Sequence, residues 1–287
     1  MTRASGRWPA PSLFGAVLVA APVVLGIAYA ATGAVGLTGI GATGFSLHRL
    51  SRVLAERTVW RSIGFSIWVA GAATILSVAA AACAAIMFRG RSVTNRIARA
   101  LAVAPLAVPY VVAGAVGLLI LGQSGYLARL AYAWGWLTSP DEMPALVYDL
   151  RGIGVILTLA WKEFPFLALV AFSLLATRGS ALEETARTLG AGWWATLSRV
   201  TWPILWRGLL PAGTAVFIFS MGNYEAAALL APSDPLPLPM LTLERYVALD
   251  LSQRGDAYVL TLVALLLAVA AVGVHEWTRA RAEIFDE

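Results

Sequence analysis

Long apolar runs separated by short polar segments dominate the chain. Six of these runs are long enough, or nearly so, to cross about 30 Å of hydrocarbon as a helix. They lie at about residues 12–31, 62–88, 100–121, 153–176, 209–231 and 258–274. The pattern predicts an all-α membrane protein with six transmembrane helices, forming a single domain over residues 1–287.

Composition supports the same class. The 287 residues are 59% hydrophobic and only 13% charged, whereas a soluble domain is nearer half apolar and a quarter charged. The net charge of +5 is explained by arginines in cytoplasmic loops rather than by nucleic-acid binding, so a lipid bilayer is the expected partner. The single cysteine, Cys83, excludes a disulfide within the chain and a cysteine metal cluster.

The first apolar run has two interpretations. Arg3 and Arg7 precede it, and Ala28-Tyr29-Ala30 resembles a signal-peptidase site. However, about 20 apolar residues is long for the core of a signal peptide. A retained first helix is therefore favoured over a cleaved signal.

The arginines predict the orientation of the chain. They concentrate after the second and fourth apolar runs and at the end of the chain, at Arg89, Arg91, Arg96, Arg99, Arg178, Arg187, Arg199, Arg207, Arg279 and Arg281. Since arginine is retained on the cytoplasmic side, both termini are expected there, in a multi-pass protein of the cell inner membrane. One outside segment opposes this rule, because residues 48–61 carry Arg49, Arg52, Arg57 and Arg61. Its apolar spacing predicts an amphipathic helix at the outer interface.

An ordered polar segment, residues 178–207, separates the fourth and fifth runs. It contains EETARTLG at residues 183–190 and VTWP at residues 200–203. Gly190 permits a sharp bend without a Cβ penalty, and Pro203 suits the start of the next helix. The segment therefore predicts two short helices at the membrane surface, able to dock in a groove and transmit rigid-body motion. The alternative is an ordinary amphipathic loop.

This segment resembles the cytoplasmic signature loop of permease subunits in binding-protein-dependent ABC importers. That pattern is Glu-Ala-Ala, three residues, Gly, nine residues, then Ile-x-Leu-Pro. Glu184, Ala186 and Gly190 match it, whereas Thr185 replaces the first alanine. The ending is only partly met, because valine and tryptophan stand before the proline in place of isoleucine and leucine. The resemblance implies a MetI-like importer permease fold.

The resemblance also implies a site and partners. The ATPase-coupling residues would be Glu183, Glu184, Ala186, Gly190, Trp193, Trp194, Val200 and Pro203. The alternative for Trp193 and Trp194, together with Trp202, is an inner aromatic belt, and docking is favoured for the first two. The implied partners are two ABC ATPase subunits, a second permease subunit and an extracytoplasmic solute-binding protein. A different chain is favoured as the second permease.

The chain itself is not expected to hydrolyse ATP or to be an enzyme. Its only lysine, Lys162, lies in an apolar run, so the phosphate-binding loop Gly-x-x-x-x-Gly-Lys-Ser/Thr is absent. ATP and magnesium would therefore be bound by the partner subunits, and no cofactor by this chain. No metal site is expected, because His48 and His275 lack neighbouring ligand motifs.

Five residues inside the fourth and fifth runs are candidates for the translocation pathway. They are Lys162, Glu163, Asn223, Tyr224 and Glu225. An ionisable group in hydrocarbon costs about 2.5–3.5 kcal/mol on insertion scales, so such groups tend to face an interior or a water path. One interpretation is that they line or gate the translocation route. The other is that charges pair between helices, for example Lys162 with Glu225, and only fix packing.

The function expected from these observations is a pore-forming subunit of an ATP-driven importer. The 224–225 neighbourhood and the 235–246 loop look most like importers of polyamines, ferric iron, sulfate or thiamine. A carboxylate near the outer route favours a cation, so a polyamine-like solute is named first. The alternative is a secondary transporter, or ion-coupled carrier, that works without an ATPase partner.

Overall fold

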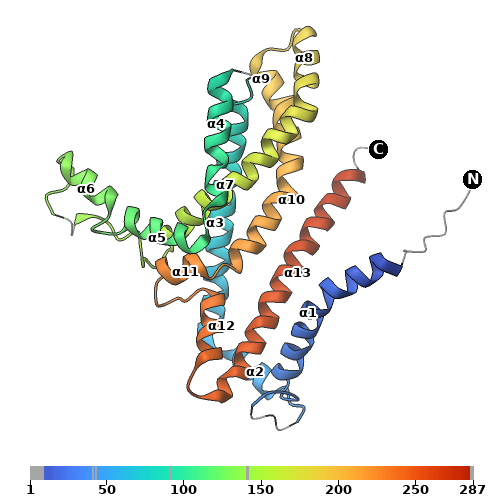
Figure 1. Cartoon of the computed structure of the whole chain (residues 1–287), viewed down its shortest axis with the longest axis vertical. Coiled ribbons are helices and arrows are strands. Elements are labelled where there is room, and N and C mark those ends of the chain that lie inside the picture. The colour runs from blue at the N-terminus through green and yellow to red at the C-terminus, as the bar shows by residue number, and fades with distance from the viewer. Residues whose placement is uncertain (1–9, 41, 43, 91, 140–141, 285–287) are drawn as a thin grey trace, which may run out of the picture. The chain divides into compact units, whose positions relative to one another are not determined.

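The computed structural model describes residues 10–40, 42, 44–90, 92–139 and 142–284, and its regular elements there are helices (Figure 1). The longest are α1 (Ala10–Ala34), α3 (Arg57–Met87), α7 (Ile153–Leu174), α10 (Trp202–Met221) and α13 (Arg254–Ile284). The shorter ones are α2 (His48–Ala55), α4 (Val93–Val103), α5 (Tyr110–Leu121), α6 (Tyr126–Ala133), α8 (Ser180–Thr188), α9 (Trp193–Thr196), α11 (Glu225–Leu230) and α12 (Leu238–Val247). The sequence interpretations that rest on Arg3, Arg7 and Arg91 lie outside the described residues.

Six segments are long and apolar enough to cross a membrane. They are Phe14–Ala34, Arg57–Met87, Tyr110–Ala133, Ile153–Thr177, Trp193–Met221 and Leu251–Trp277. The prediction of an all-α protein with six transmembrane helices is confirmed. The last helix is longer than its apolar run, since α13 continues well beyond residue 274.

The third predicted helix, residues 100–121, is not continuous. The α4 helix ends at Val103, a 3-10 turn follows over Ala104–Ala107, and α5 begins at Tyr110. Prolines at 105 and 109 explain the break, because proline lacks a backbone N–H and disfavours helical geometry in the residue before it. The prediction of one unbroken helix was wrong here because apolarity alone does not record backbone breaks.

The fifth predicted helix, residues 209–231, is also interrupted. The α10 helix ends at Met221, and α11 begins at Glu225. Between them, the Asn223 side-chain oxygen accepts a hydrogen bond from the Ala226 backbone N–H at 3.1 Å. A side-chain acceptor of this kind competes with the helical backbone ladder, so a helix ends and another begins within a few residues.

The chain divides into two compact units. One contains Met1–Arg57 and Leu241–Leu266, and the other contains Thr58–Met240 and Leu267–Glu287. We call them the first and second units. The assignment of a single permease domain over residues 1–287 stays a prediction.

The α7 helix forms the centre of the second unit. Toward its start, Leu159 joins an apolar cluster with residues of α3, α5 and α11, including Leu230. Toward its end, Leu167 joins a second cluster with α3 and α10, including Leu205. More than half of the α7 span, 56%, is buried, the largest share among the six spans. Three polar residues of α7, Thr158, Lys162 and Glu163, are therefore placed in the interior of this unit.

Candidate coupling loop and membrane-buried polar cluster

The polar segment 178–207 folds as two short helices, α8 and α9, joined by a tight turn (Figure 1). Gly190 has φ +84°, a left-handed conformation that disfavours side chains. The Gly190 N–H donates to the Arg187 carbonyl at 2.9 Å, and the Ala191 N–H donates to the Ala186 carbonyl at 3.0 Å. These two bonds close α8 as a Schellman motif, so the predicted glycine bend has its expected geometry.

One carboxylate holds this loop to the rest of the second unit. Glu183 is only 8% exposed. Its oxygens accept hydrogen bonds from Arg89 at 3.1 and 3.2 Å and from the Thr201 hydroxyl at 2.6 Å. Arg187, one turn later, approaches it at 4.0 Å. Glu183 thus joins α8 to the end of α3 and to the π-helical turn before α10.

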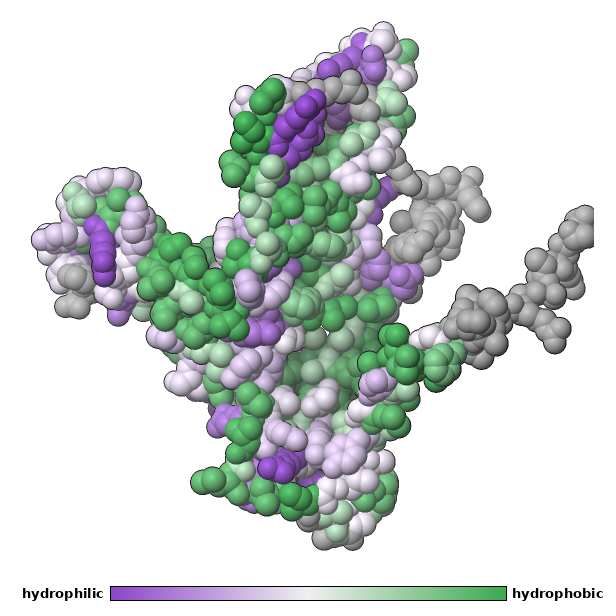
Figure 2. Space-filling model, viewed as in Figure 1, coloured by the Kyte–Doolittle hydropathy of each residue, from purple (hydrophilic) through white to green (hydrophobic). Residues whose placement is uncertain are grey.

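The other predicted coupling residues are more exposed. Glu184 is exposed, and Ala186, Val200 and Pro203 are half-buried. Trp193 is 49% exposed and Trp194 is 74% exposed, with ring centroids 4.4 Å apart. Figure 2 shows hydrophilic residues gathered over the end of this unit that carries α8 and α9, with hydrophobic surface along the helix flanks. The loop therefore has one buried anchor and an exposed face.

The two charged residues on α7 are buried. Lys162 is 4% exposed and Glu163 is 5% exposed. The Tyr110 hydroxyl donates to Glu163 at 2.6 Å, and the Lys162 ammonium donates to the Leu106 carbonyl at 3.3 Å. That ammonium also lies 4.5 Å from the Tyr110 ring centroid.

This polar cluster of Lys162, Glu163, Tyr110 and the Leu106 carbonyl secures the break between α4 and α5. A backbone carbonyl released from a helix inside hydrocarbon needs an internal donor, which Lys162 supplies. Within the described ranges, no ion pair joins Lys162 to Glu225, so the pairing offered as an example from the sequence is wrong. Sequence reasoning missed Tyr110, although its position after a proline at the start of α5 was a usable signal.

The three predicted pathway residues of the fifth run have different environments. Asn223 is 5% exposed, accepts a hydrogen bond from the Ala226 N–H in the first turn of α11, and has a side-chain nitrogen without a partner in the described part of the chain. Tyr224 is 39% exposed and Glu225 is exposed. No hydrogen bond or ion pair joins these three side chains to Lys162 or Glu163 in that part of the chain. They lie instead at the α10–α11 break, and α11 packs against α5 and α7.

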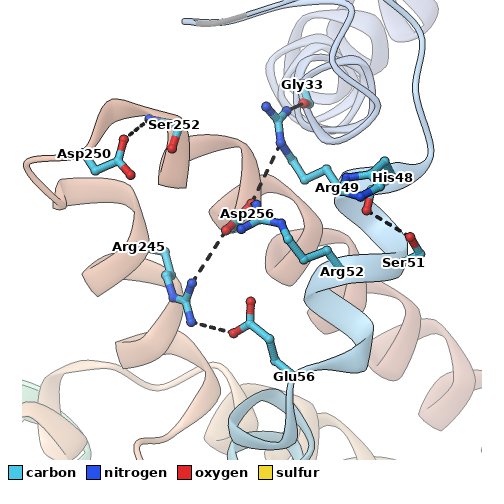
Figure 3. Close-up of polar contacts among 10 residues, drawn as sticks. All are labelled: Gly33, His48, Arg49, Ser51, Arg52, Glu56, Arg245, Asp250, Ser252 and Asp256. Carbon is cyan, nitrogen blue, oxygen red and sulfur yellow. Dashed lines mark hydrogen bonds and ion pairs between the residues drawn. The ribbon is translucent and has the colours of Figure 1, made fainter.

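Three of the four arginines that opposed the orientation rule, Arg49, Arg52 and Arg61, have carboxylate partners. In the first unit, Asp256 is only 1% exposed and lies 2.6 Å from Arg52, 3.8 Å from Arg49 and 3.6 Å from Arg245 (Figure 3). Arg245 also pairs with Glu56 at 2.6 Å. In the second unit, Arg61 pairs with Asp234 at 2.9 Å. Of the predicted helix at 48–61, α2 covers only His48–Ala55, and Arg57 and Arg61 lie on α3. Its place at the outer interface stays a prediction.

Residues 73–283 match the family described as "Binding-protein-dependent transport system inner membrane component". The chain belongs to this family. The permease is therefore a multi-pass membrane subunit of ABC importers, and its family role is transport rather than catalysis. Among the described residues, no three His, Cys, Asp or Glu side chains form a group able to hold a metal.

Individual relatives support the same family. The permease is 27% identical to the molybdenum transport system permease protein ModB of Escherichia coli K12, over 60% of this chain and 72% of that protein. It is 31% identical to a probable molybdenum ABC transporter permease protein of Haloferax volcanii, over 66% of this chain and 65% of that protein. It is 27% identical to a probable sulfate transport system permease protein of Chlorella vulgaris, over 58% of each.

A solved structure supports the fold. It is a bacterial ABC transporter involved in the import of the acidic polysaccharide alginate. The match covers 93% of each chain with a TM-score of 0.69 and 14% sequence identity. At this identity the likeness concerns the fold alone.

Proposed function

We propose that the permease forms part of the translocation path for a small tetrahedral oxyanion of the molybdate or sulfate type. The support comes from relatives named for molybdenum and sulfate transport. These names replace the polyamine-like solute that the sequence placed first, because that choice depended on one carboxylate, Glu225. The family also disfavours the alternative of a secondary transporter.

Partner subunits supply the energy for transport and act on this chain through the loop of α8 and α9. Two ABC ATPase subunits, which bind ATP and magnesium, dock on its exposed face. Leu189 is 83% exposed at the tip of the turn, and the two tryptophans beside it supply apolar area for a groove. The main support for this assignment is the set of buried hydrogen bonds that Glu183 accepts, because they fix the loop to the ends of α3 and α10. A docked partner that moves this loop therefore moves transmembrane helices.

The path itself runs beside the buried polar cluster and the α10–α11 break. Lys162 and Glu163 hold a helix break inside the membrane, and Asn223 marks a second break. Broken helices at membrane depth are tolerated where they are buried in protein or line a cavity. Tyr224 and Glu225 are exposed beside the second break, where a solute can reach them.

The remaining assembly follows from the same assignment. The permease is one domain, with residues 178–207 as its coupling loop. Both termini and that loop face the cytoplasm, and an extracytoplasmic solute-binding protein delivers the solute to the other face. A second permease chain of different sequence completes the pore.

Uptake into proteoliposomes tests this function. The permease is co-purified with its second permease and ATPase subunits, and radiolabelled molybdate, sulfate and spermidine are supplied with the binding protein. We expect ATP-dependent uptake of an oxyanion and none of spermidine. Uptake of spermidine alone would overturn the substrate class, and solute accumulation by the permease without ATPase subunits would overturn the role.

A further inference from the structure

A charged cavity of about 530 Å³ opens beside the coupling loop in the second unit. Its apolar part is formed by Ala85 of α3 and by Phe172 and Leu175 near the end of α7. Its polar part comes from the loop after α3, from α4 and from α8, and includes Arg89, Arg99, Glu183, Glu184 and Arg187.

The charges around this cavity are not balanced. Arg89 and Glu183 neutralise one another through their hydrogen-bonded ion pair. The side chains of Arg99 and Glu184 have no hydrogen bond or ion pair among the described residues, and the nearest carboxylate to Arg187 is 4.0 Å away. Two arginines and one carboxylate therefore leave a surplus of one positive charge. A phosphodiester, which carries a single negative charge, matches that surplus.

The depth of the cavity matches the level of lipid headgroups. Ala85 belongs to the last turn of the span Arg57–Met87, and Phe172 and Leu175 belong to the end of the span Ile153–Thr177. The cavity thus lies where hydrocarbon gives way to the polar interface. Basic pockets between transmembrane helices at this level are suited to phospholipid headgroups, and arginine is suited to phosphate through its forked donors.

We propose that this cavity binds the headgroup of an anionic phospholipid. Arg99 and Arg187 donate hydrogen bonds to the phosphodiester oxygens, and the acyl chains lie against the apolar side formed by Phe172 and Leu175. The carboxylate of Glu184 opposes the anion and limits its affinity. Because Arg187 and Glu184 are on α8, a bound lipid fastens the coupling loop to α4. Lipid binding itself does not depend on the proposed import function.

Lipid binding to the purified full chain tests the proposal. The probe is phosphatidylglycerol in nanodiscs of phosphatidylcholine, with bound lipid counted by native mass spectrometry after release of the chain. Arg99→Gln should weaken phosphatidylglycerol binding about tenfold, the effect expected for loss of charge-assisted hydrogen bonds. Glu184→Gln should strengthen it, because the repulsive charge is removed.

Matched variants make the test specific. Arg96→Gln removes the same charge from the same helix, but Arg96 does not line the cavity, so binding should be unchanged. Arg99→Lys keeps the charge and should retain part of the affinity. Thermal unfolding of each variant checks that the chain is folded. Where Arg99→Gln fails to fold, Arg187→Gln provides the same comparison.

Three results would overturn the proposal. The first is equal loss of binding in Arg96→Gln and Arg99→Gln, which would indicate only general surface charge. The second is unchanged binding in both Arg99→Gln and Arg187→Gln. The third is displacement of phosphatidylglycerol by equimolar inorganic phosphate, which would indicate a site for a free anion. ATP-driven uptake is measured separately, so failure of the import function leaves these results interpretable.

Discussion

Two buried carboxylates, one in the coupling loop and one in the membrane interior, are similar in burial and in their shortest hydrogen bond. Glu183 and Glu163 are 8% and 5% exposed, and each accepts a hydrogen bond of 2.6 Å from a hydroxyl. They differ in charge compensation. Glu183 has the Arg89 guanidinium at 3.1 Å, whereas Lys162, beside Glu163, is directed to a backbone carbonyl.

This difference in charge compensation indicates that Glu183 is a fixed anchor, whereas Glu163 belongs to a part of the molecule that moves. An ion pair with added hydrogen bonds fixes one arrangement, since breaking it leaves a buried charge uncompensated. Glu163 accepts its hydrogen bond from a neutral hydroxyl, so it is fixed less strongly. The neighbouring Lys162 ammonium donates to a different helix segment instead. We infer that the Glu183 contacts persist through transport and that the contacts of Lys162 and Glu163 change as the pore opens.

The largest expected effect comes from removing the anchor. Glu183→Ala leaves Arg89 and Thr201 without their acceptor and should destabilise the chain by about 2–4 kcal/mol, with ATP-driven uptake abolished. Glu184→Ala is the matched control, since the neighbouring exposed carboxylate should leave the unfolding temperature unchanged while it weakens coupling. Thermal unfolding in detergent and uptake assays check both variants. Equal unfolding temperatures for the two would refute the anchor assignment.

The membrane cluster is tested by Tyr110→Phe. The substitution removes the donor to Glu163 and should cost about 1–3 kcal/mol while lowering uptake about tenfold. Tyr126→Phe, on the exposed surface of α6, is the control and should have no effect. ATPase docking, measured by co-purification, should be intact in both variants. Loss of docking in Tyr110→Phe would show that Glu163 is an anchor of the same kind as Glu183.

The turn of the coupling loop gives a smaller effect. A Cβ at Gly190 or at Gly192 meets no atom within 4 Å, but only Gly190 has positive φ. Gly190→Ala should therefore cost about 1 kcal/mol and weaken ATPase binding several-fold, because the loop loses its fixed shape. Gly192→Ala should bind normally. Titration of ATPase subunits against the purified permease measures the difference, and equal affinities would remove the turn from the docking geometry.

The smallest effect on stability is expected for an exposed ion pair. Arg61 and Asp234 are 2.9 Å apart, but their side chains are 51% and 60% exposed. Arg61→Gln should change stability by less than about 1 kcal/mol, and by less still at high salt, because water and ions screen such pairs. Thermal unfolding at two salt concentrations measures this. A loss as large as that of Glu183→Ala would show that burial is not what separates these carboxylates.

Much of the fold, and the bend of the coupling loop, could be predicted from local sequence patterns. The six spans depend on run length, and the bend at Gly190 depends on a residue type that tolerates positive φ. Both are properties of neighbouring residues, so the sequence contains them. The breaks at the starts of α5 and α11 also have local causes, in Pro109 and Asn223, although run length and apolarity alone do not reveal them.

The partners of the buried charges were not predictable in the same way. Tyr110 and Glu163 are 53 residues apart, and Arg89 and Glu183 are 94 residues apart. Only the packing of α3, α5 and α8 around α7 brings them together. The same limit applied to Glu183 and Glu184, because adjacent carboxylates on one helix are distinguished only by which side faces the interior. Asp256 was missed as the partner of α2 for the same reason.

Site-specific photocrosslinking tests the central claim most directly. A photoreactive amino acid is placed at Leu189, on the exposed turn of the coupling loop, or at Leu249, which is 100% exposed between α12 and α13. If the loop of α8 and α9 receives the motion of the ATPase subunits, Leu189 will crosslink to them and Leu249 will not. Crosslinks to the ATPase from Leu249, with none from Leu189, would contradict both the coupling role and the orientation of the chain.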